Sequence, residues 1–295
     1  MWSVFFACIG QDKNSSEGFN VVETEAEDTE IAEILDTGEP EELSSGECDD
    51  AYLLELDFTD LSANIWRYDI TTHVATELGS PDCEFNISGD YMIAMTADSK
   101  GMLWMLSREG DIYLVVPATL QCSYTRINFH GGSSFVPQGL AFMRDGENSP
   151  DVLYVSGVSE LDQQAYLGIQ NGNGLSVIGA VDGIGGVGNN IIDLAGTADG
   201  QLFGLRPSGS QSALTEISPS DASPIHDWML DIPAPNGWSF VSLFGAFWTF
   251  TSEAGANTEV HQWNPDGEIL HHYNTLPFQT VGAAMPTCAP ESSGS

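Results

Sequence analysis

Lysine and arginine are scarce in this sequence: 7 basic residues stand against 43 aspartates and glutamates, which gives a formal net charge of −36 over 295 residues. So acidic a surface repels the phosphates of DNA, RNA and anionic membrane faces, and it attracts cations such as Ca²⁺. The few basic side chains also leave few anchors for the phosphates or carboxylates of a substrate. The composition therefore excludes nucleic acid as a partner and argues against anionic substrates.

The sequence also lacks helical periodicity and the usual catalytic motifs. It contains no long stretch of helical spacing and no Gly-x-Ser-x-Gly elbow. The glycine-rich run 179–188 has no Lys after it, so it does not match a phosphate-binding loop. The six histidines show no zinc-ligand spacing, and His271 and His272, as neighbours in a strand, should face opposite ways. The sequence thus identifies no catalytic residue.

What the sequence does contain is a repeated segment of short apolar strands joined by turns rich in Gly, Asp and Asn. Thr96–Trp104 parallels Thr197–Phe203, and each has an Asp and a Gly between apolar runs, which is a hairpin signal. The third strands of the five copies end near residues 69, 117, 171, 219 and 265. A period of roughly 50 residues with four strands per copy is typical of β-propeller blades.

Counting strands predicts four complete blades, at about 88–128, 138–180, 189–231 and 238–275. The remaining strands are split between the two ends of the chain. Residues 281–285 form a first strand without successors, and the three strands between 52 and 78 lack a first strand. Joined together they make a fifth blade, and this circular closure removes exposed sheet edges. We therefore predict an all-β, five-bladed propeller over residues 51–290.

Three segments of the propeller region resemble a known family. They are Ile65–Asp69, the aromatic strand Gly245–Thr251 and the closing peptide Thr280–Pro290. They are similar to an uncharacterised family of exported, propeller-like proteins, lipoproteins among them, from myxobacteria and related bacteria. The resemblance spans about 51–290 and implies a secreted or surface-attached propeller. It implies no catalytic residues.

The amino terminus resembles the end of a bacterial lipoprotein signal, because an apolar run and Ala7 precede Cys8, the residue that would be lipidated. The segment 1–8 is short for such a signal and has no basic part, so a truncated ordinary signal is the alternative. Residues 9–50 are strongly acidic, which is typical of a disordered, extended tether. We expect an exported protein, either secreted or held at the outer membrane or cell surface by lipid alone, with a disordered tail at 291–295.

Four further cysteines can form two disulfides: Cys48, Cys83, Cys122 and Cys288. The sequence leaves three pairings open. The predicted blades favour Cys48–Cys288 at the seam and Cys83–Cys122 between the first two blades, with Cys83 after an outer strand and Cys122 between a third and a fourth strand. Buried free thiols are the alternative, which an oxidising compartment disfavours.

The mouth of the central channel is the expected ligand site, since propeller ligands usually bind on the loops that enter the innermost strands. Aromatic rings beside polar groups suit contact with carbohydrate or peptide, although aromatic residues also commonly fill the contacts between blades. The candidate ligand-binding residues are Phe129, His130, Asp182, Trp238 and Phe278.

One loop offers oxygen ligands for Ca²⁺. Asp145, Glu147, Asn148 and Asp151 lie within a single turn between two strands. The loop lacks the full calcium-loop pattern, and a solvated acidic hairpin is the alternative. Calcium is the only cofactor that the sequence suggests.

The sequence therefore favours a non-catalytic binding module, monomeric, at the cell surface or outside the cell, with a glycan, peptide or protein ligand. The alternative is a hydrolase or lyase at the channel mouth, with or without help from a metal ion. A second alternative is a structural surface protein without a small ligand.

Overall fold

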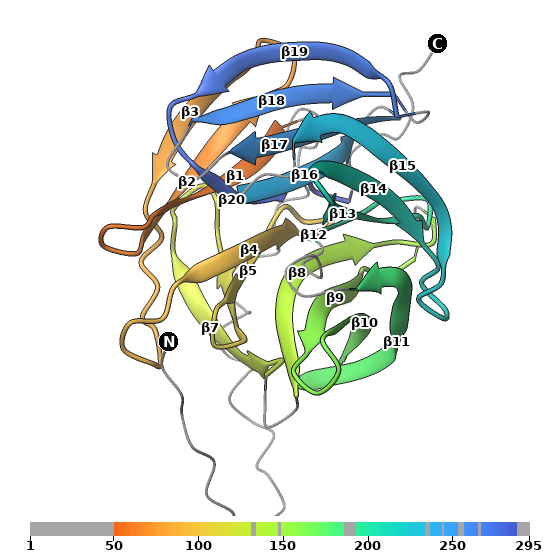
Figure 1. Cartoon of the computed structure of the whole chain (residues 1–295). Helices are drawn as coiled ribbons and strands as arrows, with labels where there is room; N and C mark the ends of the chain where they lie inside the picture. Colours follow the sequence, from red (N-terminus) through yellow and green to blue (C-terminus); the bar gives the residue numbers. More distant parts are fainter. Residues whose placement is uncertain are drawn as a thin grey trace, which may run out of the picture. The chain divides into compact units, whose positions relative to one another are not determined.

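The computed structural model describes residues 50–130, 134–146, 149–185, 193–233, 237–243, 245–252, 257–264 and 267–287 (Figure 1). The chain divides into two units, residues 1–41 and 42–295, and all of the described residues belong to the second. The predicted lipidation site Cys8 and the predicted pair Cys48–Cys288 lie outside the described residues. No helix in the described part of the chain is long and apolar enough to cross a bilayer.

The described strands form five four-stranded antiparallel sheets, which are the blades of a β-propeller. From its innermost to its outermost strand, blade 1 consists of β20 (Thr280–Ala284), β1 (Asp50–Asp57), β2 (Ser62–Asp69) and β3 (Val74–Gly79). In the same order, blade 2 consists of β4 (Met92–Ala97), β5 (Leu103–Ser107), β6 (Asp111–Val115) and β7 (Cys122–Asn128). Blade 3 consists of β8 (Phe135–Met143), β9 (Val152–Ser159), β10 (Gln164–Asn171) and β11 (Gly174–Gly185).

The last two blades follow the same order. Blade 4 consists of β12 (Asp193–Gly196), β13 (Leu202–Ser208), β14 (Gln211–Ile217) and β15 (Pro224–Pro233). Blade 5 consists of β16 (Gly237–Leu243), β17 (Ala246–Ser252), β18 (Thr258–Trp263) and β19 (Ile269–Leu276). The innermost strands contact one another in a closed ring, in the order β20, β4, β8, β12 and β16. The predicted all-β fold and the number of blades are confirmed.

Blade 1 is assembled from both ends of the described chain, as the split strands predict. β20 pairs antiparallel with β1, with Leu53 opposite Ala283 and Leu54 opposite Gly282. A Cβ atom on Gly282 would lie 2.9 Å from the backbone nitrogen of Met95 in blade 2, so a larger residue would push the two innermost strands apart. The close contact of β20 with β4 therefore depends on this glycine.

Turn chemistry fixes the hairpins of the blades, as in the turn between β4 and β5. Oδ1 of Asp98 accepts hydrogen bonds from the backbone nitrogens of Lys100 (2.9 Å) and Met102 (3.0 Å). Gly101 supplies the positive φ of 73° that this turn needs. Oδ2 of Asp98 accepts a third bond, at 3.2 Å, from the indole nitrogen of Trp104 on β5. The Asp and Gly that mark this turn in the sequence therefore stabilise it in two ways: Asp98 accepts hydrogen bonds, and Gly101 adopts the required backbone conformation.

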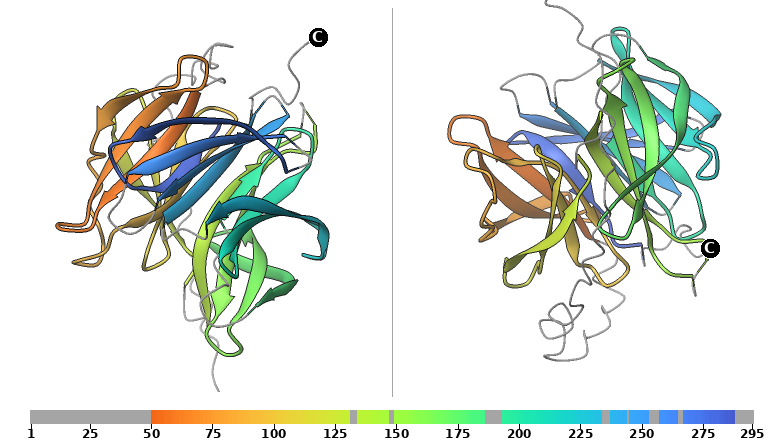
Figure 2. Two further views of the ribbon diagram at one scale, coloured as in Figure 1. Left: turned by 45° about the horizontal axis from the view of Figure 1, so that its top comes forward. Right: turned by 90° about the horizontal axis from the view of Figure 1, so that it is seen from below.

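Large apolar side chains fill the spaces between neighbouring blades. Blades 5 and 1 meet where Phe250 and Val260 pack with Leu53 and Tyr68, and the rings of Tyr68 and Phe250 meet edge to face at 5.4 Å. The strands of these two blades lie side by side in both views of Figure 2. Burying each such side chain contributes about 1.5–3 kcal/mol, so the blade interfaces supply much of the fold's stability.

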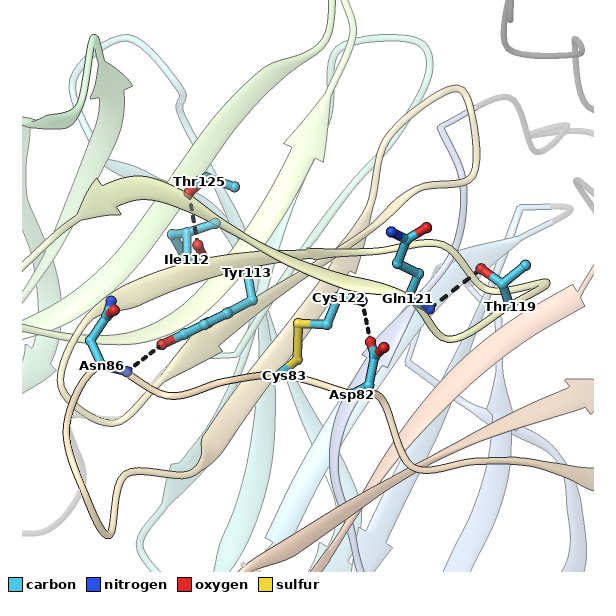
Figure 3. The surroundings of a disulfide bond; sticks show 9 residues. All are labelled: Asp82, Cys83, Asn86, Ile112, Tyr113, Thr119, Gln121, Cys122 and Thr125. Carbon is cyan, nitrogen blue, oxygen red and sulfur yellow. Dashed lines mark hydrogen bonds between the residues drawn. A yellow bond between two sulfur atoms is a disulfide. The ribbon is translucent and has the colours of Figure 1, made fainter. Parts of the chain in front are cut away.

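A disulfide joins Cys83 to Cys122, which confirms this part of the predicted pairing (Figure 3). Cys83 lies on the connection from blade 1 to blade 2, and Cys122 is the first residue of the outermost strand β7 rather than part of the turn before it. The backbone nitrogen of Cys122 also donates a 2.6 Å hydrogen bond to Oδ1 of Asp82. The disulfide therefore secures the connecting segment to the outer edge of blade 2.

Candidate functional site

A cavity of about 480 Å³ opens at the end of the channel where the innermost strands begin. Some of the residues that line it stand at or just before the start of an innermost strand. Others stand at the end of the next strand outward in a blade, or in the turn that follows that strand. The polar residues of the lining are Arg108, Glu109, His130, Gln138, Glu160 and Asp193. The apolar and aromatic residues of the lining include Leu56, Phe58, Tyr91, Ile93, Trp238 and Val281. A cavity of this size is in the range of small-molecule sites.

The described residues leave much less space at the opposite end of the channel. There a cavity of only about 10 Å³ is lined by residues at the ends of the innermost strands, among them Thr96, Phe142 and Ala284. That volume holds at most about one water molecule. The wider end is therefore the candidate site.

Two of the predicted ligand-binding residues, His130 and Trp238, lie in the lining of the wide cavity. The other two aromatic candidates need correction. Phe129 is 2% exposed and packs in the core with Ile112 and Leu140, and Phe278 is 5% exposed and stacks on Trp66 with ring centroids 4.3 Å apart. Both rings fill contacts within and between blades, so they are not available to a ligand.

The remaining predicted residue, Asp182, lies on β11, whose side chains beyond Val181 are outside the described part. β11 is the outermost strand of blade 3. Its backbone thus belongs to the outer edge of the blade and not to the innermost strands that surround the cavity.

The turn between β5 and β6 places Arg108 and Glu109 at the cavity. Oδ1 of the buried Asp90 accepts hydrogen bonds from the backbone nitrogens of Tyr91 (2.9 Å) and Glu109 (3.3 Å). The backbone nitrogen of Arg108 donates a 2.9 Å hydrogen bond to the carbonyl oxygen of Tyr91. The guanidinium of Arg108 lies 5.8 Å from the centre of the Tyr91 ring. The ring of Tyr91 and the guanidinium of Arg108 therefore lie together at one side of the cavity, next to the backbone of Glu109.

His130 is positioned by the same turn. Its backbone nitrogen donates to Oδ1 of Asn128 at 3.0 Å, and the backbone nitrogen of Phe129 donates to the carbonyl oxygen of Gly110 at 2.9 Å. Gly110 has a φ of 87°, and a Cβ atom there would lie 2.8 Å from Cβ of His130. The glycine thus permits both the turn and the approach of the histidine.

Asp193 is the most perturbed titratable group in the lining. It is the first residue of β12 and is 6% exposed, and its Oδ2 accepts hydrogen bonds from Ser239 Oγ (2.6 Å) and from the backbone nitrogen of Phe240 (3.3 Å). Burial raises the pKa of this carboxyl to about 7, although the hydrogen bonds from Ser239 and the backbone act in the opposite direction. Asp193 therefore links blade 4 to blade 5, and its carboxyl group loses its proton around neutral pH rather than near pH 4.

Sequence reasoning missed Asp193 and Gln138. A lone carboxylate in an apolar run of the sequence, Ile191-Ile192-Asp193-Leu194, was the available signal for Asp193. No comparable signal exists for Gln138, which lies in the cavity lining at a register shift between Pro137 and Gly139 in the pairing of β8 with β9.

The predicted calcium loop is corrected in part. Oδ2 of Asp151 accepts hydrogen bonds from the backbone nitrogen (2.9 Å) and the hydroxyl (2.6 Å) of Ser99, and its Oδ1 accepts one from Thr287 Oγ1 at 2.6 Å. Asp151 is thus occupied by contacts between blades rather than available to an ion. Asp145 forms a single backbone bridge with Asp199 of blade 4, while Glu147 and Asn148 lie outside the described residues.

No protein-family model and no curated protein matches this chain. Solved structures with a related fold include a protein of unknown function from Bacteroides caccae, 12% identical with a TM-score of 0.43, covering 77% of this chain and 73% of its own. Regucalcin, a calcium-binding protein from Agrobacterium tumefaciens strain C58, is 13% identical with a TM-score of 0.42, and the match covers 82% of this chain and 79% of regucalcin. The Dos1 propeller is 8% identical with a TM-score of 0.40, and the match covers 75% of this chain and 67% of the Dos1 chain. Identities and scores this low carry no argument about activity.

Proposed function

We propose that this protein is a non-catalytic binding module whose cavity at the channel mouth takes a small, neutral, polyhydroxylated ligand such as the end of a glycan. The observation that carries the proposal is the cavity of about 480 Å³, in which the rings of Tyr91 and Trp238 lie among Arg108, Gln138 and Glu160. An aromatic face stacks on the C–H face of a sugar ring, while amide, carboxylate and guanidinium groups bond to its hydroxyls. A site of this size is suited to one or two sugar units and not to a folded protein partner.

The proposal includes a location outside the cell. The disulfide Cys83–Cys122 supports export, because such bonds persist in oxidising compartments. The scarcity of Lys and Arg supports a protein that binds neither nucleic acid nor an anionic membrane face. Lipid attachment through Cys8, a monomeric state and membership of the exported myxobacterial family belong to the same proposal.

Binding of a panel of neutral mono- and disaccharides to the full chain, measured by isothermal titration calorimetry with and without added CaCl₂, tests the proposal. Trp238→Ala should weaken binding by about tenfold or more through loss of the stacking face. The matched control is Trp228→Ala, since both indoles are half-buried and pack on the same core cluster, but Trp228 does not line the cavity. Equal losses in the two variants, or no binding of any sugar, would contradict the proposal, and a dependence on CaCl₂ would assign calcium a role.

Asp193 favours one alternative, a hydrolase that works in the cavity. A carboxyl group whose pKa lies near 7 can donate a proton to a leaving group at mildly acidic to neutral pH, which is what general acid catalysis needs. Incubating the chain with chromogenic glycosides at pH 5–7 separates the two functions. Turnover that is lost in Asp193→Asn while sugar binding persists would establish the enzyme.

A further inference from the structure

Blade 5 brings two histidines and a glutamate together on one face of its outer half. His261 on β18 lies directly opposite His272 on β19, and Glu259 precedes His261 by two residues, so that it shares its face of the strand. One ligand atom from each of the three side chains lies within 4.8 Å of the others. His271 is paired with Gln262 and faces the other side of the sheet, as expected for a neighbour of His272.

The cluster cannot be recognised from the spacing of these residues in the sequence, because they lie on two paired strands. His261 is only 5% exposed, whereas the side chain of Glu259 is 51% exposed and His272 is also exposed. Nε2 of His261 lies 3.9 Å from Oε2 of Glu259, and its Nδ1 is buried without a hydrogen-bond partner among the described residues. A buried imidazole nitrogen without a partner costs stability, so hydrogen bonding among the described residues does not explain why a histidine occupies this position.

We propose that Glu259, His261 and His272 form a binding site for a zinc-class divalent ion. Two imidazoles and a carboxylate are a donor set that Zn²⁺ takes readily, with a fourth position left for water. Ca²⁺ is not the expected ion, since it prefers six or more oxygen ligands.

Only small movements separate the present arrangement from a tetrahedral site. Zn²⁺ lies about 2.0–2.2 Å from nitrogen and oxygen ligands, which places the ligand atoms about 3.4 Å from one another. The rings of His261 and His272 are now stacked, with centroids 4.4 Å apart and an angle of 9° between their planes. The ring of His272 must therefore turn out of the stack, and the carboxylate of Glu259 must approach by rotation. Because both side chains are exposed, they are free to move, while the buried His261 holds its position.

The three residues do not line the cavity at the channel mouth, so ion binding and sugar binding can be measured independently.

Titration calorimetry of the full chain with ZnCl₂, in the presence of excess CaCl₂ to occupy sites made of carboxylates alone, tests the proposal. We expect one Zn²⁺ per chain to remain bound. His272→Ala and Glu259→Gln, both at exposed positions, should each weaken binding by roughly tenfold or more, and His261→Ala should abolish it. The matched control is His271→Ala, which removes a neighbouring imidazole from the opposite face and should leave the affinity unchanged.

The visible spectrum of the Co²⁺-loaded chain provides a second measurement, because tetrahedral Co²⁺ absorbs far more strongly than the hexahydrated ion. An intense band that is lost in His272→Ala but kept in His271→Ala supports the site. The proposal is overturned if no Zn²⁺ binds in excess CaCl₂, or if the His271 variant loses as much affinity as the His272 variant.

Discussion

The hydroxyl of Thr287 donates a 2.6 Å hydrogen bond to Oδ1 of Asp151, a residue 136 positions earlier in the chain. Asp151 precedes β9 of blade 3, and Thr287 follows β20 of blade 1. Through its other oxygen Asp151 also accepts two bonds from Ser99 in blade 2. A single carboxylate thus connects three blades at the end of the channel opposite the wide cavity.

Asp151→Ala should therefore destabilise the propeller by about 2–4 kcal/mol, because it leaves the backbone nitrogen and hydroxyl of Ser99 and the hydroxyl of Thr287 without their acceptor. Urea unfolding followed by tryptophan fluorescence measures the loss. Thr287→Val removes only one of the three bonds and should cost about 1 kcal/mol. If the two variants lost the same stability, Asp151 would not act as the shared acceptor.

Asp193 should make stability depend on pH. Its pKa is about 7 in the folded protein against 3.8 ordinarily, so between about pH 4 and pH 7 the folded state binds more protons than the unfolded chain. Its contribution to stability therefore falls as pH rises through this window. The total change is on the order of 4 kcal/mol, at about 1.4 kcal/mol per pKa unit.

Asp193→Asn abolishes this titration while keeping an oxygen that can accept from Ser239. Relative to the unmodified chain, the variant should gain stability as the pH is raised from about 4 to about 8. Urea unfolding at both ends of the range is the measurement, with Asp231→Asn on β15 as a control that removes an exposed carboxylate. A stability difference that stays constant with pH would show that folding does not raise the pKa of Asp193.

Gly110 should control the position of His130. Gly110→Ala puts a Cβ atom 2.8 Å from Cβ of His130 and forces a side chain onto a residue with a φ of 87°. We expect a loss of about 1–2 kcal/mol from the backbone alone and a measurable fall in ligand affinity as His130 is displaced. Gly172→Ala is the matched control, since that glycine also has a positive φ, of 57°, but no atom within 4 Å of the added Cβ. If the two variants bound the ligand with comparable affinity, His130 would have no role in binding it.

The disulfide should stabilise the protein by roughly 3–4 kcal/mol, as expected for a covalent loop of this length. Cys83 and Cys122 are separated by 39 positions. Replacing both by Ala should lower the urea midpoint by the corresponding amount, and a peptide map without reduction should show the two cysteines linked in the unmodified chain. A map that shows these two thiols free would contradict the assignment.

The sequence was sufficient for the architecture because the signals for blades are local. Alternating apolar residues and turns such as Asp98–Gly101 repeat often enough to be counted, and the split strands at 52–78 and 281–285 left only circular closure as a way to pair them. The partner of Cys83 could be predicted for the same reason, since both cysteines lie near strands whose order was already known.

The residues of the site were harder to predict from the sequence, because the burial of a side chain depends on which face of a pleated strand meets the next blade. Phe278 and Trp238 both precede or begin innermost strands, yet only Trp238 reaches the cavity. Asp151 looks like an ion ligand in its own loop because its true partners, Ser99 and Thr287, are 52 and 136 positions away. The pairing of His261 with His272 needed the exact register of two strands, which includes irregularities on both sides of the pair.

The placement of β20 has a consequence for the order in which the molecule can assemble. Blade 1 receives its innermost strand from residues 280–284, so β1 keeps an open hydrogen-bonding edge until that late part of the chain has been made. Pairings between such distant segments form slowly, since the intervening chain must first be brought together. Four blades can form as the chain emerges, but the wide cavity, which includes Val281 in its wall, is complete only after the last strand has docked. A chain that ends before residue 280 would thus lack both a closed ring and a finished binding site.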